Sequence, residues 1–125
     1  EKGFIPWDGG TQRLPRLIGT SRATEMILSS RILASDEALD LGLVNLVTEP
    51  EDVVSRAIEL ASTIARHGPT ANRYIKAAVM KGLDMTLEHG MRLEADLSFL
   101  LQSASDRAEG LASFLERRPP TYTGK

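Results

Sequence analysis

The sequence of 125 residues contains no cysteine, only two histidines and few aromatic side chains, which make up 5% of the chain. The absence of cysteine excludes disulfides, thiolate metal sites and thiol nucleophiles in these residues. It also fits a reducing compartment, and we predict a cytoplasmic protein. The histidines, His67 and His89, stand far apart and match no metal-binding pattern, so we predict neither a metal site nor a redox cofactor.

Long apolar runs and a strong charge of one sign are missing as well. No apolar run approaches the roughly 20 residues that a membrane-spanning helix needs, so we predict no membrane partner. The formal net charge is -2, which provides no bulk attraction to nucleic acid. The chain opens on glutamate in a segment that reads like the middle of a protein, so we expect further sequence before it.

Glycines and prolines divide the sequence into short segments, most of which show helical spacing of apolar residues. The pattern predicts one short strand, residues 43–47, which is rich in β-branched side chains and is closed by Glu49-Pro50. The fold class predicted from the pattern is therefore a mostly α fragment with one or two short strands. The predicted helices are approximately residues 11–18, a segment starting at 20, 35–42, 51–67, 70–81, 86–101 and 105–118.

Side chains at several helix starts are of the types that cap helices. Thr70 and Thr86 are predicted N-caps of their helices. Asp106 and Glu109 have the spacing of a capping box at the start of the last helix. Pro119-Pro120 ends that helix and leaves a polar tail.

Three segments resemble the enoyl-CoA hydratase/isomerase (crotonase) family. The first is residues 5–19 (IPWDGGTQRLPRLIG), and the second combines residues 25–28 (EMIL), 34–38 (ASDEA) and 41–44 (LGLV). The third combines residues 105–110 (SDRAEG) and 112–119 (ASFLERRP). The segments occur in family order with family-like gaps and together cover nearly the whole chain.

The resemblance implies the C-terminal part of an α/β crotonase-like (ClpP/crotonase) fold. Residues 1–50 would form the end of the crotonase-like core, and residues 51–125 a helical region for coenzyme A binding and oligomerisation. Members of this family bind acyl-CoA thioesters and stabilise an enolate-like intermediate with two backbone N–H groups. Those donors and the two glutamates of the hydratases would lie before this chain. Glu1 could replace one glutamate only in a shifted register.

The turn before the first helix carries the residues for which we predict substrate contacts. The resemblance places Pro6 and Trp7 where they would line the acyl pocket. Asp8 stands next to a position where some family members carry a catalytic carboxylate, so it is a candidate acid/base group. Aspartate is also a preferred N-cap, which is the simpler interpretation of Asp8. We attribute Gly9-Gly10 to close packing rather than to phosphate binding, because the phosphate-binding patterns are absent.

The last helix carries the second set of candidates. Phe114 and Arg117 match family positions where an aromatic side chain covers the adenine of coenzyme A and a basic side chain meets its phosphates. Adenine stacks on aromatic rings, and a guanidinium suits phosphate. The simpler alternative is a core phenylalanine and a solvated cation at the C-terminal end of a helix.

These observations predict an enzyme that adds water to the 2,3 double bond of an enoyl-CoA, with coenzyme A present only as part of the substrate. Double-bond isomerisation, or hydration of a cyclic dienoyl-CoA, is the alternative within the family. An alternative of another class is an assembly module that is inactive as an isolated chain. The partners implied by the resemblance are the N-terminal crotonase core and further copies in a homo-trimer or hexamer.

Overall fold

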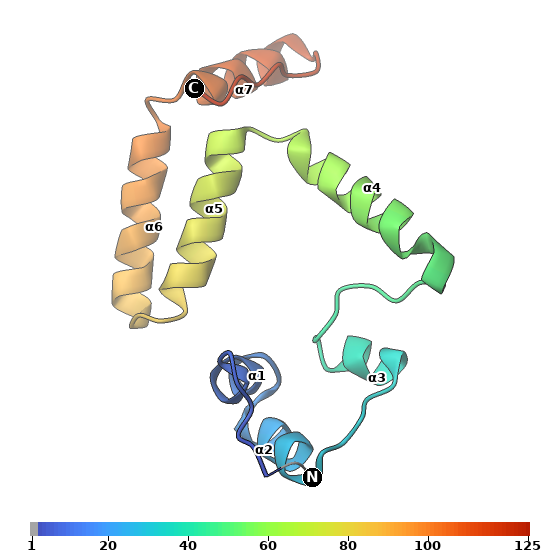
Figure 1. The fold of residues 1–125 in the computed structure, drawn as a ribbon. Helices are drawn as coiled ribbons and strands as arrows, with labels where there is room; N and C mark the ends of the chain where they lie inside the picture. Colours follow the sequence, from blue (N-terminus) through green and yellow to red (C-terminus); the bar gives the residue numbers. More distant parts are fainter. Residues whose placement is uncertain (1–2) are drawn as a thin grey trace. The chain divides into compact units, whose positions relative to one another are not determined.

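The computed structural model describes residues 3–125 and divides the chain into two compact units, Glu1–Val53 and Val54–Lys125. Figure 1 shows that every regular element in the described part is a helix. The first unit contains α1 (Gly10–Ile18), α2 (Thr20–Ser29), α3 (Ser35–Asp40) and the 3-10 turn η1 (Pro50–Asp52). The second contains α4 (Val53–Ala65) from its second residue on, α5 (Pro69–Gly82), α6 (Leu87–Leu101) and α7 (Ser105–Glu116). The predicted helices are confirmed to within a few residues.

The predicted strand at residues 43–47 is wrong. This segment has no regular structure, and the described residues contain no strand with which it could pair. The N–H groups of Leu43 and Val44 instead donate to the carbonyl of Ala38, at 2.9 and 3.4 Å, and close the end of α3. A strand needs a hydrogen-bonded neighbour, so β-branched composition without a partner is not sufficient.

The helices α1 and α2 of the first unit are joined by a single residue, Gly19. Its φ of 85° and ψ of 154° lie in a region of backbone conformation that is essentially limited to glycine. The Gly19 N–H donates to the carbonyl of Pro15 at 3.0 Å, and its own carbonyl accepts from Ala23 at 3.1 Å. Ile18 and Ala23, on either side of this joint, are the buried hydrophobic residues of the described chain.

In the second unit, α5 and α6 lie side by side as an antiparallel pair (Figure 1). They approach closely where two glycines face each other, because a β-carbon on Gly90 would lie 3.6 Å from the α-carbon of Gly82. Thr86 caps α6 as predicted, accepting a hydrogen bond from the His89 N–H at 3.3 Å. Thr70 does not cap α5, since it is the second residue of that helix and Gly68 occupies the cap position.

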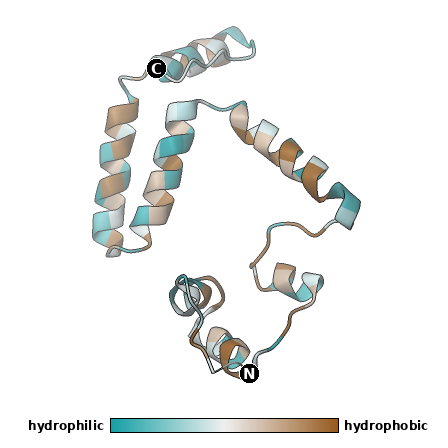
Figure 2. Cartoon of the chain, in the orientation of Figure 1, coloured by the Kyte–Doolittle hydropathy of each residue, from teal (hydrophilic) through white to brown (hydrophobic). Residues whose placement is uncertain are grey.

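Apolar side chains remain exposed on the helices of the second unit. Every residue of α4 is exposed, although the helix carries apolar side chains along its length (Figure 2). α5 and α6 also expose large apolar side chains, among them Ile75, Val79, Met91 and Phe99. No helix in the described residues is long and apolar enough to cross a membrane.

Candidate functional site

The turn before α1 holds Trp7, Asp8 and Gly9 in a tight reversal. Asp8 and Gly9 both have positive φ, 54° and 77°, and the Trp7 carbonyl accepts from the Gly10 N–H at 3.2 Å. The Arg13 guanidinium donates to the carbonyl of Asp8. Asp8 is not the N-cap of α1, because Gly9 occupies that position and no side chain makes a capping bond. The N-cap interpretation is therefore wrong, and the conformation suits aspartate because short polar side chains tolerate positive φ.

The aromatic side chains of this turn are exposed. Trp7 is 75% exposed and lies edge-on to Phe4, with ring centroids 6.4 Å apart and an angle of 84° between the rings. A β-carbon on Gly10 would lie 3.0 Å from the β-carbon of Pro6, so glycine is needed for this close approach. The structure thus brings Pro6, Trp7 and Asp8 together in one turn. Their substrate contacts stay predictions, and Glu1 lies outside the described residues.

Phe114 and Arg117 lie together at the C-terminal end of α7. Phe114 is 79% exposed, so it is not a core residue in the described chain. Arg117 ends the helix in the left-handed conformation, with φ 55° and ψ 38°, and its N–H donates to the carbonyl of Phe114 at 3.3 Å. Glycine is the usual residue at such a position, because it adopts positive φ without steric cost. An exposed aromatic ring and a guanidinium on residues three apart at one helix end have the chemistry required to bind an adenine nucleotide.

Directly after Arg117, the chain reverses at Arg118, which binds two carboxylates of α7. Its guanidinium donates to both oxygens of Glu109, at 2.6 and 2.9 Å, and to Glu116 at 2.6 Å. The Thr121 N–H donates to Glu109 at 2.7 Å. The hydrogen bond from Arg118, followed by that from Thr121, lowers the pKa of Glu109 to about 2, and the two glutamates raise the pKa of Arg118.

Asp106, near the start of α7, is 5% exposed and holds the end of the chain. Its Oδ1 accepts from the Thr123 N–H at 2.6 Å, and its Oδ2 accepts from the Gly124 N–H at 2.8 Å. The predicted capping box of Asp106 and Glu109 is therefore wrong, because both carboxylates bind the tail and α7 has no side-chain cap. Sequence spacing identified the pair of carboxylates but assigned them to the wrong donors.

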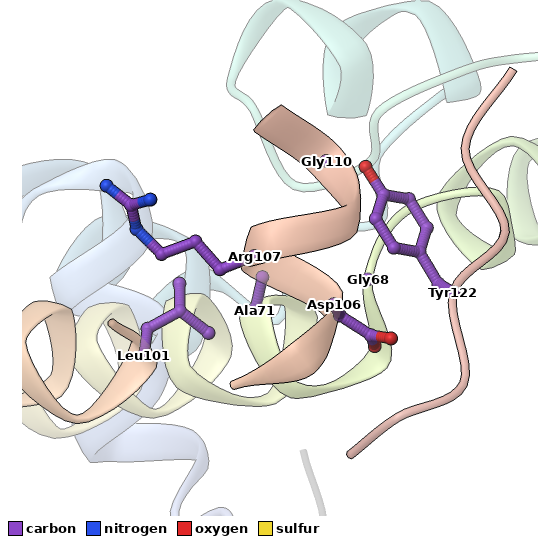
Figure 3. A pocket seen from close by; sticks show the side chains of 7 residues that line it. All are labelled: Gly68, Ala71, Leu101, Asp106, Arg107, Gly110 and Tyr122. Carbon is purple, nitrogen blue, oxygen red and sulfur yellow. The ribbon is translucent and has the colours of Figure 1, made fainter. Parts of the chain in front are cut away.

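A cavity of about 230 Å³ lies between α5, the end of α6, α7 and the tail. Figure 3 shows Tyr122 extending from the tail beside Gly110 and Gly68, with Asp106 below it. A β-carbon on Gly110 would lie 3.3 Å from the Tyr122 hydroxyl, so a larger residue at that position would require the tyrosine to shift by a few tenths of an ångström. The residues that line the cavity are Gly68, Ala71, Leu101, Asp106, Arg107, Gly110 and Tyr122.

The lowered pKa of Glu109 predicts a specific dependence of stability on pH. A carboxyl with a lower pKa in the folded state stabilises the fold fully above its unfolded value, 4.5, and this contribution disappears as the pH falls through about 2. We expect the difference in stability between wild type and Glu109→Gln to be largest above pH 4.5 and to narrow steadily towards pH 2. Urea unfolding at a series of pH values measures it. A difference that stays constant with pH would contradict the ion pair, and Asp96→Asn on α6 is the matched control.

The residues singled out from the sequence fall into two groups, one in each unit. Sequence reasoning missed the Arg118 cluster and the docked tail. The signal in the sequence that could have indicated them is the spacing of Asp106 and Glu109, together with an arginine just beyond the helix end. Among residues 3–125, no group of acidic or histidine side chains is arranged to hold a metal ion.

The chain is similar to known proteins along its whole length. The family model described as enoyl-CoA hydratase/isomerase matches residues 1–125. A crotonyl-CoA hydratase from Syntrophomonas wolfei is 37% identical over 123 residues, covering 98% of this chain and 47% of that protein. A methylglutaconyl-CoA hydratase from Mus musculus is 41% identical over 126 residues, covering 98% of this chain and 40% of that protein.

A solved structure supports the same relationship. The crystal structure of an enoyl-CoA hydratase from Bacillus anthracis matches with a TM-score of 0.95 and 41% identity, covering 98% of this chain and 48% of that chain. A short-chain-enoyl-CoA hydratase from Clostridioides difficile is 39% identical over 112 residues, covering 90% of this chain and 72% of that protein. The chain thus spans less than half of the other three relatives.

Proposed function

The chain belongs to the enoyl-CoA hydratase/isomerase family, and from this premise we propose that the full-length protein hydrates the 2,3 double bond of an enoyl-CoA thioester. The fold of the chain is that of the C-terminal part of a crotonase-like enzyme. The observation that carries the proposal is the match to the family model over residues 1–125, together with relatives named as enoyl-CoA hydratases. Isomerisation is the less favoured alternative.

In this reaction, the oxygen of a water molecule adds to C3 of the enoyl group as a hydroxyl group, and a proton adds to C2. The negative charge that develops on the thioester oxygen needs preorganised donors, each typically worth about 10²–10³-fold in rate. We place those donors, and the glutamates that handle water and proton, in the part of the protein that precedes this chain. Asp8 remains a candidate acid/base group, and Asp8→Asn would preserve its backbone preference while removing the carboxylate.

The contribution that we assign to the chain itself is binding of the nucleotide of coenzyme A. Phe114 offers an exposed ring for the adenine, and Arg117 offers a guanidinium for a phosphate. A non-glycine residue in the left-handed conformation costs on the order of 1 kcal/mol. The presence of arginine where glycine would be less strained supports a binding role for its side chain.

The exposed apolar faces of α4, α5 and α6 have a place in the same proposal. Large exposed apolar patches usually mark interfaces. We propose that these faces pack against the N-terminal crotonase core and against further copies in a trimer or hexamer. As an isolated chain, the molecule would then be an inactive assembly module.

The location that we propose for the full-length protein is the cytoplasm.

The proposal is tested with the full-length protein and a series of trans-2-enoyl-CoA substrates. We expect loss of the conjugated enoyl absorbance and formation of the 3-hydroxyacyl-CoA product. Migration of the double bond without uptake of water would support the isomerase alternative. Failure to hydrate any member of the series would refute the proposed reaction.

Replacing Arg117 by glycine separates binding from folding. Arg117→Gly keeps the left-handed helix end but removes the guanidinium, so we expect KM for an enoyl-CoA to rise roughly tenfold while kcat stays unchanged. The corresponding enoyl-pantetheine ester, which lacks the nucleotide, should show the same KM with both proteins. Steady-state kinetics with the two substrates measure the effect. An unchanged KM for the CoA ester would remove Arg117 from the nucleotide site.

A further inference from the structure

The last residues of the chain turn back and run along α7 towards its start, as Figure 3 shows beside the helix. We call residues 121–125 the tail strap. Three of its backbone N–H groups donate to carboxylates of α7: Thr121 to Glu109 at 2.7 Å, Thr123 to Asp106 at 2.6 Å and Gly124 to Asp106 at 2.8 Å. Hydrogen bonds to charged acceptors are among the stronger ones in proteins.

The far end of the strap is held by one further residue of α7 and one residue of α5. The Ser105 hydroxyl donates to the carbonyl of Lys125 at 2.7 Å, and the Thr70 hydroxyl donates to the carbonyl of Gly124 at 3.3 Å. Gly124 has φ 80°, and a β-carbon there would lie 3.6 Å from Pro69, the first residue of α5. The strap therefore connects the start of α5 to the start of α7.

Tyr122 fills the space between these anchors. Its ring lies against Gly110 of α7 and Gly68 before α5, where β-carbons would stand 3.3 and 3.7 Å from its atoms. Asp106, which accepts hydrogen bonds from two N–H groups of the strap, is among the few buried polar residues in the described chain. A buried carboxylate that accepts hydrogen bonds from two backbone N–H groups holds its own helix and the strap in a fixed relative position.

From these contacts we propose that Asp106 is a positioning residue: through the tail strap it sets the orientation of α7 on α5, and so places Phe114 and Arg117 for the coenzyme A nucleotide. This inference rests on the proposed function. Arg118 lies three residues before the strap, and its ion pairs with Glu109 and Glu116 hold the point where the chain reverses. Release of the strap removes hydrogen bonds that hold α7. The turn before α1, to which the strap makes no hydrogen bond among those of the described residues, is not changed.

The test changes the strap and leaves α7 intact. Thr123→Pro removes the N–H that donates to Asp106, and Thr123→Val keeps that N–H while removing only the weaker hydroxyl bond of 3.3 Å. In the full-length protein, coenzyme A itself is the probe, titrated by calorimetry. We expect Kd to rise roughly tenfold for the proline variant and to stay at the wild-type value for the valine variant.

Kinetics distinguish positioning from a general loss of structure. For Thr123→Pro we expect KM for an enoyl-CoA to rise by a similar factor, with kcat and the KM of the enoyl-pantetheine ester unchanged. Hydrogen exchange at the Gly124 amide should become fast in the proline variant, which confirms that the strap is released. If Thr123→Pro does not fold, Asp106→Asn weakens the same contact by replacing one carboxylate acceptor with an amide.

The outcomes separate this inference from the proposed function. A released strap with unchanged Kd and KM would overturn the inference and leave hydration untouched. Wild-type protein that binds coenzyme A with the expected strap dependence but hydrates nothing would refute the reaction and support the positioning role. Failure of both variants to fold, or absence of coenzyme A binding by wild type, would overturn the positioning role.

Discussion

Gly90→Leu is expected to lower the free energy of unfolding of the full-length protein by about 2–3 kcal/mol. A β-carbon at this position would already lie 3.6 Å from the α-carbon and the carbonyl oxygen of Gly82. The remaining carbons of leucine would therefore be directed at the backbone of α5 rather than at a side chain that can move. The two helices must separate to admit them, which removes contacts along the pair.

The matched control is Gly90→Ala. At 3.6 Å the added methyl group makes an ordinary van der Waals contact, and alanine is favoured over glycine inside a helix by up to about 1 kcal/mol. We therefore expect no loss of stability, or a small gain. Urea unfolding followed by far-UV circular dichroism measures both variants. Equal stability of the leucine and alanine proteins would mean that α5 and α6 are not in close contact.

Gly19→Ala is expected to lower the free energy of unfolding by about 2 kcal/mol, a large effect for the addition of a single methyl group. No atom lies within 4 Å of the place that a β-carbon would occupy, so crowding is not the cause. The cost arises from the backbone, whose φ of 85° and ψ of 154° an alanine can hardly adopt. A change of these angles would reorient α1 against α2 and disturb Ile18 and Ala23.

The effect of Gly19→Ala is measured by hydrogen exchange of the α1 and α2 amides and by urea unfolding. Ser21→Ala, two residues away on the exposed start of α2, gives an alanine where the backbone is helical and a β-carbon is already present. It should change stability by no more than about 0.5 kcal/mol. A loss for Gly19→Ala as small as that for Ser21→Ala would show that the joint tolerates a side chain and would contradict the conformational argument.

Local sequence patterns predicted the helices well because each helix depends on periodicity within a few residues and on glycine or proline at its ends. The strand at residues 43–47 failed because its formation depends on a distant partner, which local composition does not reveal. The predictions of capping residues at helix starts were only partly confirmed. Thr86 caps as predicted, whereas Thr70 and Asp106 bind the tail.

The candidate site shows the same division between local and distant information. The pairing of Phe114 with Arg117 at one helix end follows from their spacing in the sequence. The left-handed conformation of Arg117 and of Asp8 does not, since neither is glycine. The tail was predicted only as a polar segment. Its docking needs Asp106, Glu109 and Arg118 to act together over more than one turn of helix.

Apart from the packed ring of Tyr122, the tail strap is bound mainly through its main chain, which bears on how its sequence can drift. Asp106 and Glu109 accept N–H groups that all residues except proline possess. Substitutions at positions 121 and 123 should therefore accumulate freely, while glycine is retained at 124 because of its positive φ. Two related enzymes could then have tails with little sequence in common and still hold their last helices in the same way.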